Sequence, residues 1–404
     1  MESKRRAVKW SFFLSFLVLV SLFLVSHGMA ATAREPYTVG LSAVRTGPAA
    51  ISYMPSSEGF RIYIQKINDE GGINGRPVKL MLEDDGGSGA KAATNIKKFA
   101  EAGASLVMVS STSATYAAAI AEAKRANIPI IFSGGSVSAP QAAPPNPDPL
   151  VFVASDKGAA TDPHKAMQPI SQLADGPVTL GMVVTDIPVA VMIAKKNREL
   201  AEAKGWTVVE SRFPMGTFDL TPVAEEWIKK GVNWGVEHGP GGARLMYPAL
   251  MKRGWKGNFL IIGEAFNYLS KMKADNLYAA CAVAPLELNL PEHKEVTAAA
   301  KKYKASILLT ESLWGWDAAK VLEKIFKQVG WPVTTKNLLN VMNNFEIDNR
   351  PLSRVTKWTA NDHVGFFIWR VYKWDNTKNK VIAVTDWWRA DAIGKIVEKV
   401  GPNL

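Results

Sequence analysis

Apolar and polar positions along this chain follow two periods in turn, one typical of strands and one typical of helices. Residues 38–42 have the pattern of a short strand, and residues 57–70 then carry apolar side chains at helical spacing: Phe60, Tyr63, Ile64 and Ile67. Gly71 and Gly72 end this segment, because glycine accepts the left-handed backbone that follows a helix. The pattern therefore predicts a strand followed by an amphipathic helix.

The same alternation continues along most of the chain and restarts after a proline-rich stretch at 140–149. Further strands are predicted at 78–83, 106–110, 128–132, 178–185, 206–211, 232–237 and 259–263. Strands that alternate with helices predict an α/β fold with parallel sheets covered on both faces, here as two doubly wound, Rossmann-like arrays. The tail differs, because 366–374 and 381–388 predict an antiparallel hairpin.

Residues 1–33 have the pattern of a secretory signal peptide. Four basic residues precede an apolar run over 10–25, and small residues at 28–33 offer two cleavage sites. The alternative is a membrane anchor, but the 16 residues of this run fall short of the roughly 20 that span a bilayer. We therefore expect an exported, periplasmic protein, where an α/β fold has no supply of ATP or NAD.

Composition narrows the class of partner. The mature chain of about 370 residues is too long for one ordinary core, which favours two domains. The formal net charge of +11 is spread along the chain, without a dense basic tract interleaved with aromatic residues, so nucleic acid is not an expected partner. The single cysteine, Cys281, stands among alanine and valine residues and is expected to be a buried thiol.

Motifs of catalysis and cofactor binding are not found. The five histidines lack metal-ligand spacing, and Gly86–Gly89 lacks the spacing of a dinucleotide or phosphate loop. Glu83–Asp85 could form an acid/base pair or a metal site, but a solvated loop that supports the next helix is the favoured interpretation. We therefore expect no enzyme activity, no catalytic residue, no metal and no cofactor.

Polar clusters at predicted strand ends suggest a ligand site instead. Ser110–Ser113 and Ser133–Ser136 each follow a strand, and ligands of open α/β sheets bind outside the carboxyl ends of strands. Hydroxyl and backbone N–H groups there can hold a carboxylate, although capping and turn formation alone also favour serine and glycine. Glu264 and His238 end two later strands, where a carboxylate would suit an ammonium group but could equally be a surface charge.

The segment Ile67–Val78 closely resembles the signature of the leucine/isoleucine/valine-binding proteins, the extracytoplasmic receptors of branched-chain amino acid ABC transporters. Further matches follow in the same order as in that family: Thr46–Ala49, Ser110–Ser113, Gly134–Ser136, Gly263–Glu264 and Trp316–Ala319. The resemblance implies a type I periplasmic binding fold, in which two lobes close on a ligand by hinge motion.

By this resemblance, three crossovers fall near 151–156, 282–286 and 355–363. Lobe one then takes 34–153 and 286–357, and lobe two takes 154–285 and 358–404. The resemblance also implies that Ser111, Gly135 and Ser136 hold the ligand carboxylate, that Glu264 receives its ammonium group, and that a monomer delivers the ligand to an ABC permease in the inner membrane.

The chain departs from the family where the pocket is expected. Val189 stands where an aromatic residue is common after Asp186, and His238 lies in a loop that is often rich in glycine and tyrosine. The predicted ligand-binding residues are Ser110, Ser111, Thr112, Gly134, Gly135, Ser136, Asp186, Val189, His238, Glu264 and Trp316. The expected ligand is a branched-chain or related amino acid; an aromatic or aliphatic carboxylate, a small amide, and a role as a sensing module remain alternatives.

Overall fold

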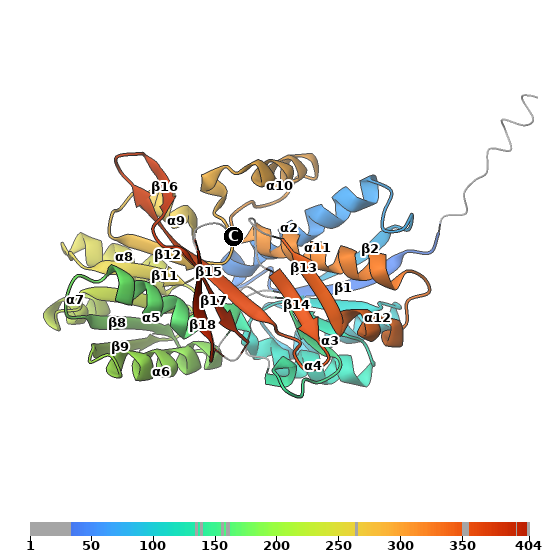
Figure 1. Cartoon of the computed structure of the whole chain (residues 1–404), viewed down its shortest axis with the longest axis horizontal. Helices are drawn as coiled ribbons and strands as arrows, with labels where there is room; N and C mark the ends of the chain where they lie inside the picture. Colours follow the sequence, from blue (N-terminus) through green and yellow to red (C-terminus); the bar gives the residue numbers. More distant parts are fainter. Residues whose placement is uncertain are drawn as a thin grey trace, which may run out of the picture.

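The computed structural model describes residues 34–133, 136–137, 140–154, 157–158, 162–262, 266–349, 355–392 and 394–401. Two sheets organise this part of the chain, with helices packed around them (Figure 1). We call the part built on the five-stranded sheet lobe one and the part built on the nine-stranded sheet lobe two. The predicted signal peptide, residues 1–33, lies outside the described residues.

Lobe one contains a fully parallel sheet in the order β2-β1-β3-β4-β6. Its strands are β1 (Tyr37–Ala43), β2 (Val78–Asp84), β3 (Leu106–Ser110), β4 (Ile130–Phe132) and β6 (Val151–Val153). The connecting helices are α2 (Ala50–Asp69), α3 (Gly89–Glu101) and α4 (Tyr116–Arg125). β3 and β4 are buried along their whole length, which explains their continuous apolar runs.

Lobe two repeats this order and then extends it. The parallel strands β8 (Thr179–Thr185), β9 (Thr207–Phe213), β10 (Trp234–His238), β11 (Asn258–Ile262) and β12 (Leu277–Cys281) are ordered β9-β8-β10-β11-β12. The helices of this lobe are α5 (Asp162–Leu173), α6 (Pro188–Glu202), α7 (Thr221–Lys229), α8 (Gly242–Lys252) and α9 (Phe266–Met272). The predicted α/β fold with two doubly wound lobes is confirmed.

The C-terminal strands join lobe two in antiparallel fashion. β15 (Phe366–Asp375) pairs with β12, and β16 (Lys380–Ala383), β17 (Trp387–Asp391) and β18 (Val397–Gly401) complete this region. The predicted hairpin is present between β15 and β16. Its second strand is shorter than predicted, because the chain leaves the ladder after Ala383 and returns as β17 to pair with another part of β15.

The remaining elements lie in the segments that connect the strands of the two sheets. They are β5 (Ser136–Val137), β7 (Lys157–Gly158), η1 (Ser113–Thr115), η2 (Pro140–Ala142), η3 (Leu286–Leu288), α10 (Pro291–Lys302), α11 (Ser312–Val329), α12 (Thr335–Met342), β13 (Asn344–Asp348) and β14 (Val355–Thr359). The chain passes from the first sheet to the second after β6, returns between β12 and α11, and passes back between β14 and β15. The predicted residue boundaries of the lobes stay a prediction.

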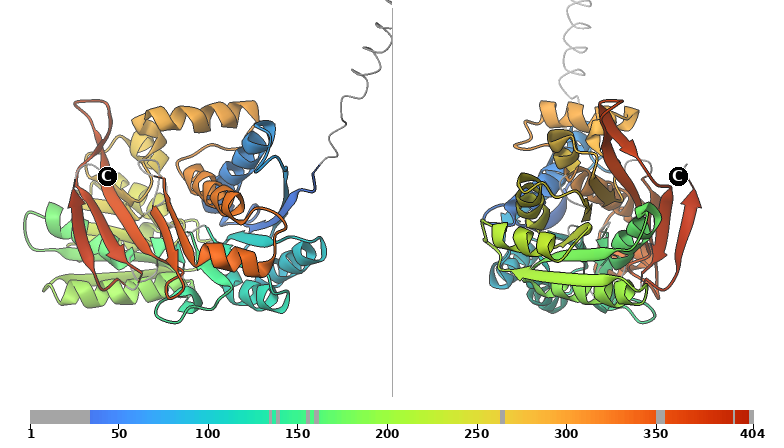
Figure 2. Two further views of the ribbon diagram at one scale, coloured as in Figure 1. Left: turned by 45° about the vertical axis from the view of Figure 1, so that its right-hand side comes forward. Right: turned by 90° about the vertical axis from the view of Figure 1, so that its left-hand side faces the viewer.

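α11 returns to lobe one and packs closely on α2, far from it in sequence (Figure 2). The approach depends on two glycines, since a Cβ on Gly59 would lie 1.9 Å from the Ser312 carbonyl oxygen and one on Gly315 would lie 1.7 Å from that of Ser56. α2 itself begins at Ala50, seven residues before its predicted start, and runs through Pro55. The early start brings Tyr53 onto the helix.

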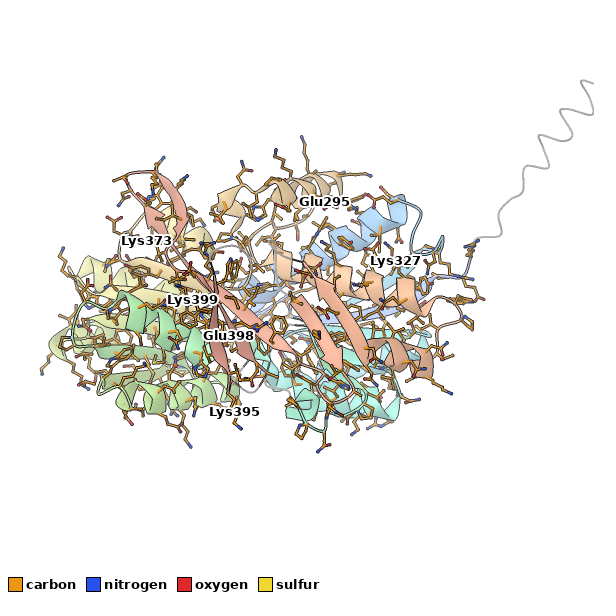
Figure 3. All side chains as sticks on the ribbon, viewed as in Figure 1. Glu295, Lys327, Lys373, Lys395, Glu398 and Lys399 are labelled. Carbon is orange, nitrogen blue, oxygen red and sulfur yellow. The ribbon has the colours of Figure 1, made fainter. Side chains whose placement is uncertain are left out.

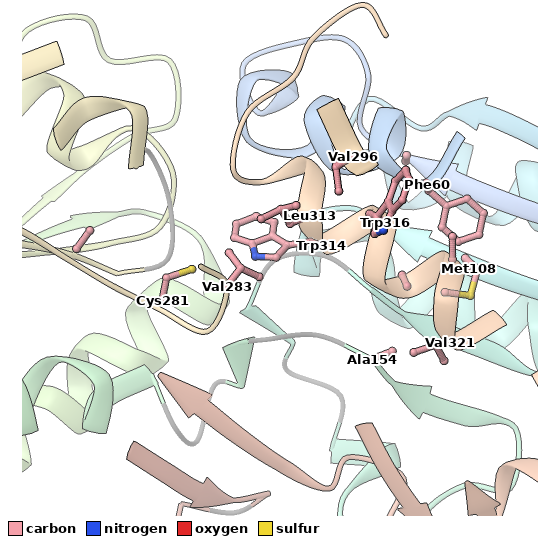
Figure 4. Packing of buried hydrophobic residues seen from close by; sticks show 14 of the residues in the cluster. Phe60, Met108, Ala154, Cys281, Val283, Val296, Leu313, Trp314, Trp316 and Val321 are labelled. Carbon is pink, nitrogen blue, oxygen red and sulfur yellow. The ribbon is translucent and has the colours of Figure 1, made fainter. Parts of the chain in front are cut away.

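One cluster of buried apolar side chains contains residues of both lobes, and α11 contributes to it. Figure 4 shows Trp314 directed toward the segment that carries Cys281 and Val283, where the chain leaves β12. Trp314, Cys281 and Val283 belong to one buried cluster. Cys281 is buried, as predicted. Apolar packing therefore accompanies this passage of the chain between the lobes.

Charged side chains of both signs are spread over the surface. Figure 3 labels acidic and basic residues on elements of both lobes, including Glu295 on α10, Lys327 on α11 and Lys373 on β15. Many form short-range ion pairs, such as Lys66 with Glu70 at 2.8 Å.

None of the helices in the described part of the chain is long and apolar enough to cross a membrane.

Candidate functional site

A cavity lies between the two lobes, and we call it the cleft cavity. Lobe one contributes Tyr53 and Ser113, and lobe two contributes Asp162, Ile187, Val189, Ala190, Ile193, Glu237, His238, Gly239, Pro240 and Ile262. Its volume is about 40 Å³, which is room for about three water molecules. A ligand of amino acid size therefore requires the walls to move apart.

The lobe-two wall carries a carboxylate and an imidazole next to each other at the end of β10. Glu237 is buried, and its Oε2 accepts a hydrogen bond of 2.7 Å from the backbone N–H of Ala243 in the first turn of α8. Negative charge is favourable at a helix N-terminus, because the first backbone N–H groups have no partner within the helix. The strand end and the following helix thus fix an acidic group in the cavity wall.

His238 is uncharged near neutral pH. It is buried, and burial lowers the pKa of its imidazole to about 3, although the charge of Glu210 opposes this shift. Its Nε2 lies 2.7 Å from the amide nitrogen of Asn197 on α6. A neutral imidazole offers hydrogen bonds to a ligand but supplies no counter-charge to a carboxylate.

Asp85, which follows β2, supports the lobe-one wall through hydrogen bonds. Asp85 is fully buried and accepts hydrogen bonds of 2.8 Å each from Ser42, Ser111 and the backbone of Gly87. Burial raises the pKa of this carboxyl group, and the three hydrogen bonds oppose the shift. The interpretation of Glu83–Asp85 as a solvated loop is therefore wrong for Asp85, which ties the ends of β1, β2 and β3 together.

The serine cluster after β3 divides into two kinds of hydroxyl group. The Oγ of Ser110 donates to Ser56 at 3.2 Å, and that of Ser111 donates to Asp85. Ser113 differs, because its Oγ is buried and has no hydrogen-bond partner among the described residues. Since Ser113 also lines the cleft cavity, its hydroxyl is a ready donor for a ligand.

The structure brings some of the predicted residues together and separates others. Val189 and His238 line the cleft cavity. Ser110, Ser111 and Thr112 are buried directly before Ser113. These residues therefore lie at or next to the cavity.

Two further predicted residues lie outside the cavity lining. Asp186 is exposed, and its backbone N–H donates to the backbone carbonyl oxygen of Phe213 at 2.8 Å. Trp316 is buried within lobe one, where its ring meets that of Tyr63 edge-on at 4.7 Å; Figure 4 shows it beside Phe60. The ring of Trp316 thus belongs to the packing of α11 on α2 rather than to the cavity wall.

Four predicted residues cannot be placed in this way. Gly134, Gly135 and Glu264 lie outside the described residues, and Ser136 is described only as part of the backbone of β5. Their roles in ligand binding stay predictions.

Of the residues that line the cavity, only Val189 and His238 were among the predicted ligand-binding residues. The polar residues missing from that prediction include Tyr53, Ser113, Asp162 and Glu237, although Ser113 belongs to the cluster Ser110–Ser113 that the sequence singled out. Asp162 opens α5 and lies 3.6 Å from Lys165, with both side chains buried. A signal for Glu237 was present, because it directly precedes His238 at a strand end. Tyr53 gave no signal, since the helix was predicted to begin after it.

Within the described ranges, no group of three or more His, Cys, Asp or Glu side chains is arranged to hold a metal ion. The polar groups of the cavity can form hydrogen bonds and ion pairs with a small solute.

The chain matches the family described as periplasmic binding protein over residues 36–380. It belongs to this family, in its leucine/isoleucine/valine-binding type. Its class is therefore that of the solute-binding proteins of ABC transporters, and the family implies a location outside the cytoplasm. No curated protein matches the chain at a significant level.

Solved structures of the same fold cover nearly the whole chain at low sequence identity. A fatty acid ABC transporter substrate-binding protein from Thermomonospora curvata is 16% identical, with a TM-score of 0.73, over 92% of this chain and 96% of its own. A branched-chain amino acid ABC transporter protein from Thermus thermophilus with bound valine is 15% identical, with a TM-score of 0.75, over 87% and 96%.

A third similar structure is a solute-binding protein from R. palustris in complex with 4-hydroxybenzoate. It is 15% identical, with a TM-score of 0.72, over 91% of this chain and 98% of its own. Two of these proteins hold chemically different ligands, valine and 4-hydroxybenzoate, and the third belongs to a fatty acid transporter. At these identities the similarity shows the fold alone.

Proposed function

We propose that this periplasmic binding protein captures an amino acid with an apolar side chain between its lobes and delivers it, chemically unchanged, to an ABC permease in the inner membrane. The observation that carries the proposal is the cleft cavity. Ser113 of lobe one, whose hydroxyl has no hydrogen-bond partner among the described residues, lines the same space as the acidic wall of lobe two. An amino acid carries both a carboxylate and an ammonium group, and the two walls suit these two poles.

Each pole has a proposed partner among the described residues. Ser113 donates its hydroxyl hydrogen to the carboxylate, and the carboxylate of Glu237 attracts the ammonium group. Val189, Ile193 and Ile262 then surround the apolar side chain. Glu264, Gly135 and Ser136 remain further predicted partners of the two poles.

Closure of the lobes completes the mechanism. Because the cavity of about 40 Å³ is too small for an amino acid, the protein must open, bind and close again. The ligand stabilises the closed state only by the difference in its affinity for the two states. We expect a monomer whose closed form the permease recognises, with lobes bounded as predicted from the sequence.

A second candidate ligand is a carboxylic acid without an amine. The neutral imidazole of His238 supports it, since an uncharged hydrogen-bonding group suits a hydroxyl or carbonyl of such a ligand. Similar structures that hold 4-hydroxybenzoate and belong to a fatty acid transporter make this class worth testing.

The test is a thermal-shift screen of amino acids and amine-free acids, followed by calorimetry on Glu237→Gln. Glutamine keeps an oxygen for the Ala243 N–H, so the fold is preserved while the charge is removed. We expect affinity for the amino acid to fall by about 10-fold or more, because a charge-assisted hydrogen bond contributes about 1.5–3 kcal/mol.

Glu226→Gln, on the exposed side of α7, is the control and should leave affinity unchanged. An unchanged affinity in Glu237→Gln would remove this residue from the site. A ligand that is released in altered form would overturn the role as a receptor, and so would a screen in which no small solute raises the melting temperature.

A further inference from the structure

A second hollow, which we call the rim groove, adjoins the cleft cavity. Lobe one contributes Pro48 and Ile51, and lobe two contributes Phe213 and residues 215–218 with Pro240, Gly241 and Leu245. Its volume is about 210 Å³, against about 40 Å³ for the cleft cavity. The larger of the two spaces between the lobes therefore lies beyond the polar residues that we propose to bind the ligand.

The two spaces are separated by a turn with little side-chain bulk. Pro240 lines both of them, and it stands between Gly239 and Gly241, which have φ angles of +87° and +92°. The hydroxyl of Thr185 donates to the Pro240 carbonyl oxygen at 3.0 Å and holds the turn against the end of β8. A Cβ on Gly239 would lie 2.9 Å from Thr185, so the turn is packed as closely as its backbone allows.

The described lining of the rim groove holds no ionisable side chain. Three of its apolar residues are also unusually exposed: Ile51 at 47%, Met215 at 37% and Phe218 at 92%. Ligand sites are mostly apolar, with a few polar groups that fix orientation, and clustered exposed apolar residues mark sites of interaction. The polar cleft cavity and the apolar rim groove together have this composition.

From this arrangement we infer that the rim groove receives an apolar arm of the ligand, whose polar head lies in the cleft cavity. This inference rests on the proposed function and narrows it. The preferred ligand is an amphipathic acid whose chain is longer than the side chain of valine. The arm passes Pro240 and packs against Ile51, Phe213 and Met215.

The test measures affinity by calorimetry across two series of increasing chain length. One series is 2-aminobutanoate, 2-aminohexanoate and 2-aminooctanoate, and the other is butanoate, hexanoate and octanoate. We expect affinity to rise about fourfold for each methylene that is buried, which corresponds to about 0.8 kcal/mol. The two series separate an amino acid head from a simple carboxylate head.

A pair of matched variants tests whether the apolar arm of the ligand lies in the rim groove. The double variant Ile51→Gln with Met215→Gln should abolish most of the gain with chain length and leave the shortest ligand within about threefold of its parent affinity. Ile228→Gln with Met272→Gln is the control, because these residues are 38% and 36% exposed but lie on α7 and α9, away from the groove. The control should keep the full gain.

Each outcome is decisive. Affinity that is independent of chain length overturns the arm while leaving the proposed receptor intact, and so does a gain that the double variant keeps. Binding of neither series at any length overturns the arm together with the proposed ligand class. A gain that only the double variant loses supports the inference, and the series in which it occurs identifies the head.

Discussion

Lobe one and lobe two are two versions of one arrangement. The strand order β2-β1-β3-β4-β6 in the first corresponds to β9-β8-β10-β11-β12 in the second. In each lobe a glycine in the first strand lies under an aromatic ring from the helix that follows the edge strand. A Cβ on Gly40 would lie 2.2 Å from Phe99, and one on Gly181 would lie 2.6 Å from Trp227.

The two lobes differ where the strands end. In lobe one the edge strand leads to Asp85, which uses the hydroxyl groups of Ser42 and Ser111. In lobe two the edge strand ends at Phe213, and the third strand ends in Glu237 and His238. The comparison teaches that a repeated backbone sets the positions of the strand ends, whereas the residues at these ends differ. In lobe one they form a hydrogen-bonded scaffold around Asp85, and in lobe two they place Glu237 and His238 in the cavity wall.

The strongest test of the likeness between the lobes is to add a methyl group at Gly40 and at Gly181, where each glycine contacts an aromatic ring. Gly40→Ala and Gly181→Ala should each lower the free energy of unfolding by about 3 kcal/mol, because overpacking a well-filled core typically costs about 1–3 kcal/mol and both contacts are very short. Urea denaturation measures the loss.

Gly176→Ala is the control for these variants. Its Cβ would meet no atom within 4 Å, so stability should change by less than about 0.5 kcal/mol. Trimming the ring in Gly181→Ala with Trp227→Phe should recover part of the loss. If one lobe tolerates its alanine and the other does not, the packing is not equivalent.

A fall in pH should remove stabilising contributions from the two lobes over different pH ranges. Burial raises the pKa of Glu58 in lobe one, but hydrogen bonds from Arg61, Ser306 and Arg45 outweigh it and lower this pKa from 4.5 to about 2. Its stabilisation is therefore complete above about pH 4.5 and is lost as the pH falls toward 2. The pKa of His238 in lobe two is lowered from 6.5 to about 3, so its contribution is lost earlier, as the pH falls below 6.5.

Urea denaturation at pH 7 and pH 5 measures this difference. Between these pH values His238→Gln should remove about 2 kcal/mol of the pH-dependent loss of stability, since each pKa unit corresponds to about 1.4 kcal/mol. Glu58→Gln should leave the change between pH 7 and pH 5 nearly as it is and flatten the curve below pH 4.5. An unaltered pH dependence in His238→Gln would show that this imidazole is not held neutral by burial.

The smallest effect concerns the two serines of the lobe-one wall. Ser111→Ala should lower the free energy of unfolding by about 1 kcal/mol, as expected for one lost hydrogen bond, and change the affinity for the best amino acid of the screen by less than about threefold. Ser113→Ala should do the reverse and weaken binding with little loss of stability, because its hydroxyl has no partner in the described structure. Calorimetry and urea denaturation distinguish them, and a large loss of affinity in Ser111→Ala would contradict this division.

Much of the fold followed from the sequence because buried parallel strands need continuous apolar runs and their crossover helices need an apolar stripe. Such local patterns predicted the strands from β1 to β4 and from β8 to β11, but not β5, β6, β7 or β12, and the segment Ile67–Val78 indicated the family. The start of α2 was wrong by seven residues, since its first two turns include Pro55 and lack a clear apolar stripe.

Only part of the candidate ligand site could be predicted from the sequence. The sequence determined that polar residues gather at strand ends, because these ends share one edge of a parallel sheet. Tertiary structure alone decided which of them remain available. Asp85, 26 residues from Ser111 in sequence, accepts a hydrogen bond from the Ser111 hydroxyl, whereas the Ser113 hydroxyl has no partner in the described part of the chain. It also buried Trp316 against Tyr63 and placed Glu237 beside the cavity. The physical reason is that a hydrogen bond or a ring contact depends on a partner distant in sequence, which no local pattern specifies.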